Sequence, residues 1–226
     1  INDKEKVTHI NKGKPFPLGS SLTSQGVNFS LVATNAEYVE ILLFEKDDSI
    51  YPKSILKLDH NHNTGPYWHA EVKNINKGCI YAFRVKQKNN AINNNYEKKV
   101  LLDPCSRGIT GWESYKRENA LKTQENTNSC LKSVVCDRKL FNFKDFPRPK
   151  HSWEETIIYE LHIKSFTESA DKTESCFKKF LKKIPYLKEL GITSIELLPI
   201  FCFDPTDAPN GLDLSLIHIS EPTRRN

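Results

Sequence analysis

The chain has 226 residues, enough for one or two domains, and its 38% hydrophobic and 27% charged residues are ordinary for a globular protein. The net charge of +5 arises from 33 basic and 28 acidic residues that are scattered along the chain, so we expect no nucleic acid partner. No apolar run approaches the roughly 20 residues that a membrane-spanning helix needs, so we expect no membrane partner.

The sequence predicts a cytoplasmic protein. The first residues, Ile1 to Lys6, are largely charged, and no apolar signal-peptide region follows them. The six cysteines form neither a Cys-x-x-Cys pair nor a zinc-finger spacing with histidine, so we expect reduced thiols and no bound metal. No cofactor is predicted.

The first predicted domain is a small β-sandwich that begins at Gly13, after a polar stretch (1–12) that we expect to be disordered. Short runs of alternating apolar and polar residues follow, separated by clusters of Asn, Asp, Gly and Lys, which is typical of antiparallel strands in a sandwich. These runs are residues 26–32, 38–44, 54–58, 67–72 and 79–85. Gly78 is expected to take a positive φ in a hairpin.

We expect this domain to end at Cys105 and a connector to follow over residues 106–152, because periodic stretches are few there and breakers are common. Within the connector, Val134 to Cys136 favours a short strand. A βαβ unit then fills residues 156–200, which places its two strands parallel.

The βαβ unit consists of a β-rich run (156–167), a helical pattern (173–190) and a second apolar run (191–200). Apolar residues at steps of three and four give the helix a single apolar stripe. Pro185 predicts a kink or restart of the helix, and Gly191 stands where a C-cap glycine belongs. The last run is nearly all apolar, as expected of a parallel strand buried on both faces.

At this point the sequence resembles a known family. Three N-terminal motifs (13–20, 26–31 and 36–44) look like the immunoglobulin-like module of isoamylase-type debranching enzymes, which is carbohydrate-binding module family 48. Residues 153–167 and 191–200 are similar to the first two barrel strands of the same enzymes, which belong to glycoside hydrolase family 13.

The resemblance implies an immunoglobulin-like sandwich (13–105) followed by the first two βα units of a TIM barrel (153–213). It implies hydrolysis of α-1,6 branch linkages in glycogen or a similar α-glucan, because Lys164 to Thr167 is closer to the debranching pattern than to the Gly-Ser-Trp of branching enzymes. Two alternatives stay open: a glucan branching enzyme, which transfers chains, and a non-catalytic glucan-binding module.

Residues 214–226 look like the translation of a sequencing adapter, so we expect the native sequence to end near Asp213. A TIM barrel takes roughly 250 residues, which makes this chain an N-terminal fragment without catalytic residues and without activity of its own. Glu160, Glu196 and His162 are expected to be structural. His218, Asp204 and Asp207 have no supporting constellation of residues.

Tyr67 and Trp68 are the first candidates for substrate binding, because sugar rings stack on exposed aromatic side chains. The alternative for Trp68 is a core position on a strand. The two alternatives make different predictions for Trp68→Ala, which should unfold the module if the ring is buried and weaken glycogen binding if the ring is exposed.

Overall fold

A computed structural model describes residues 10–88, 98–137, 146, 148–168 and 173–200. The chain divides into two compact units, Ile1–Phe141 (unit 1) and Asn142–Asn226 (unit 2), which are described separately. The predicted adapter tail (214–226) lies outside the described residues.

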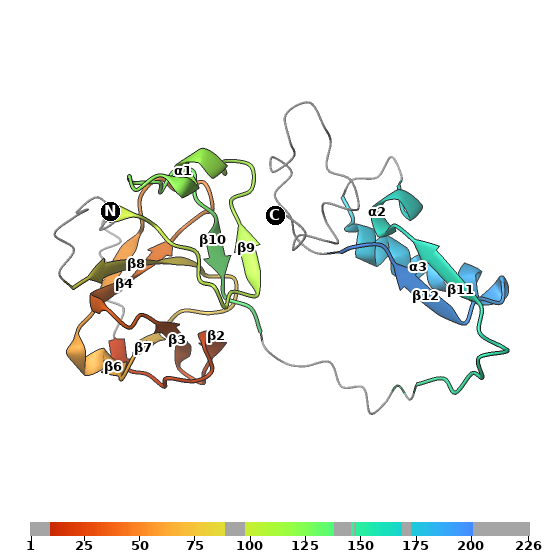
Figure 1. The fold of residues 1–226 in the computed structure, drawn as a ribbon, viewed down its shortest axis with the longest axis horizontal. Helices are drawn as coiled ribbons and strands as arrows, with labels where there is room; N and C mark the ends of the chain where they lie inside the picture. Colours follow the sequence, from red (N-terminus) through yellow and green to blue (C-terminus); the bar gives the residue numbers. More distant parts are fainter. Residues whose placement is uncertain (1–9, 89–97, 138–145, 147, 169–172, 201–226) are drawn as a thin grey trace, which may run out of the picture. The chain divides into compact units, whose positions relative to one another are not determined.

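Unit 1 is a sandwich of two antiparallel sheets (Figure 1). The first sheet has the order β1-β7-β3-β2, and β6 also pairs with β7. The second sheet has the order β5-β4-β8-β10-β9. The strands of the first sheet are β1 (Ile10–Lys12), β2 (Gly19–Leu22), β3 (Gly26–Val32), β6 (Asn63–Thr64) and β7 (Tyr67–Lys73). Those of the second are β4 (Ala36–Phe44), β5 (Ser54–Leu58), β8 (Ile80–Gln87), β9 (Gly108–Thr110) and β10 (Lys132–Val134).

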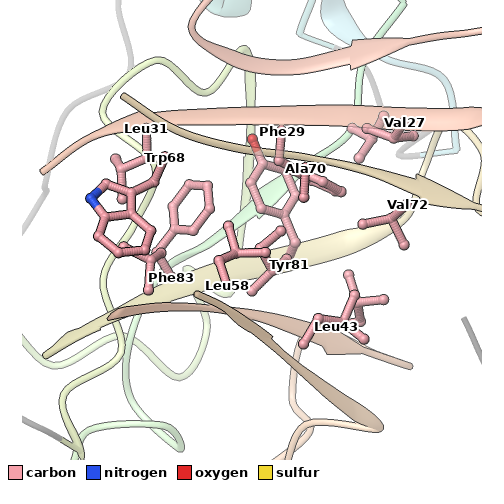
Figure 2. Close-up of a cluster of buried hydrophobic side chains, with 14 of the residues drawn as sticks. Val27, Phe29, Leu31, Leu43, Leu58, Trp68, Ala70, Val72, Tyr81 and Phe83 are labelled. Atoms are coloured by element: carbon pink, nitrogen blue, oxygen red, sulfur yellow. The ribbon is translucent and has the colours of Figure 1, made fainter. Parts of the chain in front are cut away.

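The core of unit 1 lies between the two sheets, where alternate residues of each strand point inward (Figure 2). Trp68, Ala70 and Val72 of β7 meet Tyr81 and Phe83 of β8 there. The remaining buried members of this cluster are Val27, Phe29, Leu31, Ala36, Val39, Ile41, Leu43, Leu56, Leu58 and Val135. The immunoglobulin-like sandwich is thus present, with two short helices, η1 (His60–His62) and α1 (Arg117–Leu121), in its connections.

The predicted connector contributes two strands to the second sheet. β10 pairs with β8 and β9, so the expected boundary at Cys105 divides a segment that the structure joins to the sandwich. Lys132 of β10 is fully buried. Two contacts compensate its charge there: its Nζ donates to the Asp47 carbonyl oxygen at 2.7 Å and lies 5.0 Å from the centre of the Phe44 ring. The strand predicted at Val134 to Cys136 begins and ends two residues earlier, so only Val134 was placed correctly.

Two further predictions concern the start of unit 1 and the turn between β7 and β8. The predicted disordered stretch includes β1, in which Ile10 lies opposite Val72 and packs on the core. Residues 1–9 lie outside the described residues. Gly78 has φ +86°, as predicted, and Asn74 has φ +61°. The predicted hairpin is wrong, because β7 and β8, the strands on either side of this turn, belong to different sheets.

Unit 2 is a βαβ unit, as predicted. β11 (Ile158–Leu161) and β12 (Ser194–Leu197) are parallel neighbours, and α2 (Ile163–Phe166) and α3 (Cys176–Glu189) connect them. The buried side chains of Leu161, Ile163, Phe180 and Leu187 form a small core between α2, α3 and the strands. A single βαβ unit of this kind occurs in many α/β folds.

The C-terminus of α3 has the predicted glycine cap. Gly191 has φ +85°, its N–H donates to the Lys188 carbonyl at 3.0 Å, and the Ile192 N–H donates to the Leu187 carbonyl at 3.0 Å. This pair of bonds is the Schellman motif. Pro185 lies within α3, which runs as one helix through it, so the predicted restart does not occur.

Two predictions about the strands of unit 2 differ from the structure. The first strand ends at Leu161 because the His162 side chain accepts the Ser165 N–H and starts α2 there. The second strand was expected to be buried on both faces, yet the Ile195 and Leu197 side chains of β12 are 39% and 37% exposed. Within the described residues, the sheet of unit 2 consists of β11 and β12 alone.

Candidate functional site

The structure places Trp68 in the core of unit 1, where it is 2% exposed (Figure 2). Its Nε1 donates to the Ala33 carbonyl oxygen at 3.1 Å, so the polar end of the indole is also occupied. A sugar cannot reach this ring. The prediction of Trp68 as a stacking residue is therefore wrong, and the core alternative holds.

Tyr67 points to the opposite face of the sheet, because successive side chains of a strand alternate. It is half-buried, and its ring packs against Phe16 with a centroid separation of 4.8 Å and an interplanar angle of 57°. Phe16 is 57% exposed. Sequence reasoning missed Phe16 because a lone aromatic between two prolines gives no strand or helix pattern.

The segment that carries Phe16 is fixed on the outer face of β3. The Lys14 N–H donates to Asn28 Oδ1 at 2.7 Å, and Asn28 Nδ2 donates back to the Lys14 carbonyl at 3.0 Å. Ser30 Oγ donates to the Pro15 carbonyl at 2.6 Å. Asn28 and Ser30 are both buried, so this segment covers them and leads Phe16 to the end of the sheet that holds Tyr67.

Tyr67 is fixed by strands on both sides. It lies opposite Val32 of β3 and opposite Thr64 of β6, and the Ala33 N–H donates to the Pro66 carbonyl at 2.9 Å. Gly65 makes the turn between β6 and β7 at φ +60°, a conformation that costs glycine little. Val32 is exposed and extends the apolar surface beside the two rings.

His69 lies under this surface and bonds to it. It is buried, and its Nε2 is 2.9 Å from Thr64 Oγ1. Burial lowers the pKa of His69 below its ordinary value of 6.5, and the charge of Lys12 lowers it further. The imidazole is therefore neutral at pH 7.

The acidic residues predicted to be structural are found side by side. Glu160 of β11 and Glu196 of β12 are register partners, and both side chains are exposed. Among the described residues, no group of three His, Cys, Asp or Glu side chains is arranged to hold a metal ion. His162 caps α2, while Asp204, Asp207 and His218 lie outside the described residues.

Over the residues that the structure describes, none of the helices is both long and apolar enough to cross a membrane.

Comparison with known families identifies the sandwich. Residues 17–106 match the model of carbohydrate-binding module 48, the isoamylase N-terminal domain. The glycogen debranching enzyme of Pectobacterium carotovorum subsp. carotovorum (strain PC1) is 29% identical over 207 residues, covering 86% of this chain and 30% of that protein. The glycogen debranching enzyme of Erwinia tasmaniensis is 32% identical over 208 residues, with the same two coverages.

Solved structures of similar fold were also found. One is the catalytic module of the multi-modular glycogen-degrading pneumococcal virulence factor SpuA, with a TM-score of 0.60, 21% identity, and coverage of 85% of this chain and 28% of that chain. Another is the Group B Streptococcus pullulanase SAP, with a TM-score of 0.62, 22% identity, and coverage of 84% and 24%. At these identities the likeness shows a common fold.

The chain spans about 30% of the length of the curated relatives named above. The family match lies within unit 1, and the described residues of unit 1 form the immunoglobulin-like sandwich. Residues 17–106 therefore match the carbohydrate-binding module 48 family, and 86% of the chain is similar in sequence to part of glycogen debranching enzymes.

Proposed function

We propose that this chain is part of an enzyme that hydrolyses the α-1,6-glucosidic branch linkages of glycogen or a related α-glucan. The main support for this proposal is that similarity to glycogen debranching enzymes covers 86% of the chain. Because unit 1 ends at Phe141, an alignment of that length must extend into unit 2. The similarity thus includes more than the binding-type module.

The proposal includes a TIM barrel of which unit 2 is the start. Support comes from the parallel pairing of β11 and β12 with α3 as the crossover, which is the repeating unit of such a barrel. The exposed Ile195 and Leu197 of β12 add support, because a strand inside a closed barrel would have both of its edges paired and both of its faces covered.

We propose that the 226-residue chain alone has no activity. Retaining glycosidases use two carboxyl groups about 5 Å apart, one of which must have a raised pKa to act as an acid. Glu160 and Glu196 are neighbours, but both are exposed on a sheet that has two strands within the described residues. Their role is structural, and the catalytic carboxylates belong to later barrel strands of the whole enzyme.

The free thiols support the cytoplasm as the compartment. Cys79, Cys105, Cys130, Cys136 and Cys176 are all unpaired, whereas Cys202 lies outside the described residues. Burial raises the pKa of the Cys79 and Cys130 thiols, which keeps both of them protonated and unreactive. Such thiols are typical of proteins in a reducing compartment.

The experiment is a product analysis with the protein encoded by the complete reading frame. On glycogen, a debranching enzyme releases linear maltooligosaccharides, so new reducing ends accumulate and the iodine colour deepens. A branching enzyme lowers the iodine colour of amylose without a matching release of oligosaccharides. Either that result or the absence of any change in the glucan overturns the proposal.

The 226-residue chain is assayed in parallel and is expected to release nothing from glycogen. If it releases oligosaccharides, Glu160→Gln and Glu196→Gln are assayed next. Loss of that release in either variant contradicts the structural role proposed for these two carboxylates.

A further inference from the structure

We propose that Phe16 and Tyr67 together form a binding platform for an α-1,4-linked glucan chain on the outer face of the first sheet of unit 1. This inference rests on the proposed function for its substrate class. The structure adds Phe16 as the second aromatic residue beside Tyr67, a role that the sequence had suggested for Trp68.

The exposed Phe16 ring is held in a fixed position by the segment that precedes it. Three hydrogen bonds from two buried side chains, Asn28 and Ser30, fix the backbone of Lys14 and Pro15. A Cβ atom at Gly13 would lie 2.6 Å from the Ala70 carbonyl carbon, so the segment approaches β7 closely. Phe16 is therefore presented to solvent by a rigid support, which reduces the entropy lost on binding.

The Phe16 and Tyr67 rings are tilted relative to one another, and this tilt bears on the kind of glucan that fits them. The planes of the Phe16 and Tyr67 rings meet at 57°, so the two rings are turned relative to one another. Successive glucose rings of an α-1,4 chain are also turned and the chain curves, whereas a β-1,4 chain is a flat ribbon. The tilted pair therefore fits two consecutive residues of an α-glucan better than a cellulose-type chain.

Apolar and hydroxyl groups lie beside the two rings. Val32 lies opposite Tyr67 and extends the apolar surface on which the C–H faces of a sugar pack. On the other side of Tyr67 lies Thr64, whose hydroxyl is positioned by the buried His69. The Thr64 and Tyr67 hydroxyls thus stand beside an apolar surface, a combination that suits a polyhydroxyl ligand.

The experiment is a calorimetric titration of the 226-residue chain with maltoheptaose and, separately, with cellohexaose. We expect binding of maltoheptaose, and binding of cellohexaose that is at least tenfold weaker. Phe16→Ala and Tyr67→Ala should each weaken the maltoheptaose affinity roughly tenfold, the loss expected for one stacked ring. Tyr51→Ala removes a more exposed tyrosine from another part of unit 1 and serves as the matched control.

Two conservative variants separate stacking from folding. Phe16→Leu keeps an apolar side chain but removes the ring, so it should weaken binding while the thermal melt stays unchanged. Tyr67→Phe keeps the ring and should retain most of the affinity. The platform is refuted if maltoheptaose does not bind, if Phe16→Leu binds normally, or if Tyr51→Ala loses as much affinity as Tyr67→Ala.

These results can be told apart from a failure of the proposed function. If the complete protein debranches glycogen while the 226-residue chain fails to bind maltoheptaose, only the platform is wrong. If the chain binds maltoheptaose through Phe16 and Tyr67 while the complete protein leaves α-1,6 linkages intact, only the proposed reaction is wrong.

Discussion

At the scale of single residues, the start of β7 sends two neighbouring aromatic rings to opposite faces of one sheet. Trp68 lies opposite Leu31 and enters the core, while Tyr67 lies opposite Val32 and meets solvent beside Phe16. The strand period of two predicts that the rings diverge. The buried ring is the one on the apolar face of the strand, since Trp68 shares its face with Ala70 and Val72.

Replacing Trp68 with alanine should destabilise unit 1 by about 3–5 kcal/mol, the usual cost of truncating a buried aromatic. The change leaves a cavity among core side chains and removes the donor to the Ala33 carbonyl. Chemical denaturation followed by far-ultraviolet circular dichroism measures the loss. Tyr67→Phe is the control and should change stability by less than about 1 kcal/mol. Equal stability of Trp68→Ala and the parent chain contradicts the core position.

Tyr81 makes unit 1 sensitive to alkaline pH. Its hydroxyl donates to Asp103 Oδ2 at 2.5 Å in the buried interior, and burial, followed by the Asp103 charge, raises the pKa of Tyr81 above its ordinary value of 10. Because the raised pKa favours the protonated form in the folded state, this contribution to stability is complete below about pH 10 and is lost as the pH rises further.

The comparison of Tyr81→Phe with the parent chain tests this sensitivity. At pH 7 the variant should lose about 1–3 kcal/mol, because Asp103 loses a buried donor. Between pH 9 and pH 11 the difference in unfolding free energy should shrink. A difference that stays constant over that range is inconsistent with the raised pKa.

At the scale of elements, local signals were predictable and long-range pairings were not. The end of α3 follows from Gly191 alone, since glycine adopts positive φ readily. β9 and β10 each have only three residues. They form because β10 pairs with β8, a strand far earlier in the chain, and β9 pairs with β10. No period of two can emerge over so short a run, which is why residues 106–137 had the pattern of a connector.

Gly191→Ala should destabilise the helix end by about 1–2 kcal/mol, because a Cβ atom disfavours the left-handed region. Nothing lies within 4 Å of a Cβ atom built at this position, so the cost is conformational rather than steric. Hydrogen exchange of the Gly191 and Ile192 amides reports the change. Gly191→Asn should cost less, since asparagine tolerates this region better. If amide hydrogen exchange at residues 191 and 192 is the same in Gly191→Ala as in the parent chain, the predicted loss of stability is contradicted.

At the scale of the whole molecule, the two units differ in how much of their apolar surface is covered. Unit 1 has a closed core between two sheets, whereas unit 2 exposes apolar side chains on both its helix and its strands. These are Ile157, Ile158, Phe177, Leu181, Leu190, Ile195 and Leu197. Composition alone gives no sign of this contrast.

A polypeptide of residues 1–141 should therefore fold without unit 2. Its thermal melt should be cooperative and within a few degrees of the unit 1 transition in the 226-residue chain, because the core residues of unit 1 lie within this range. Near-ultraviolet circular dichroism checks that the aromatic core is ordered. An unfolded 1–141 polypeptide shows instead that unit 1 needs residues of unit 2.

The most direct test of the whole account is co-sedimentation of the purified 226-residue chain with glycogen, followed by an assay of the supernatant for new reducing ends. The account predicts that the chain sediments with glycogen, that Phe16→Leu reduces this fraction, and that no reducing ends appear. A chain that stays in the supernatant contradicts the proposed glucan-binding role of unit 1. Accumulating reducing ends contradict the proposal that the catalytic carboxylates lie elsewhere in the whole enzyme.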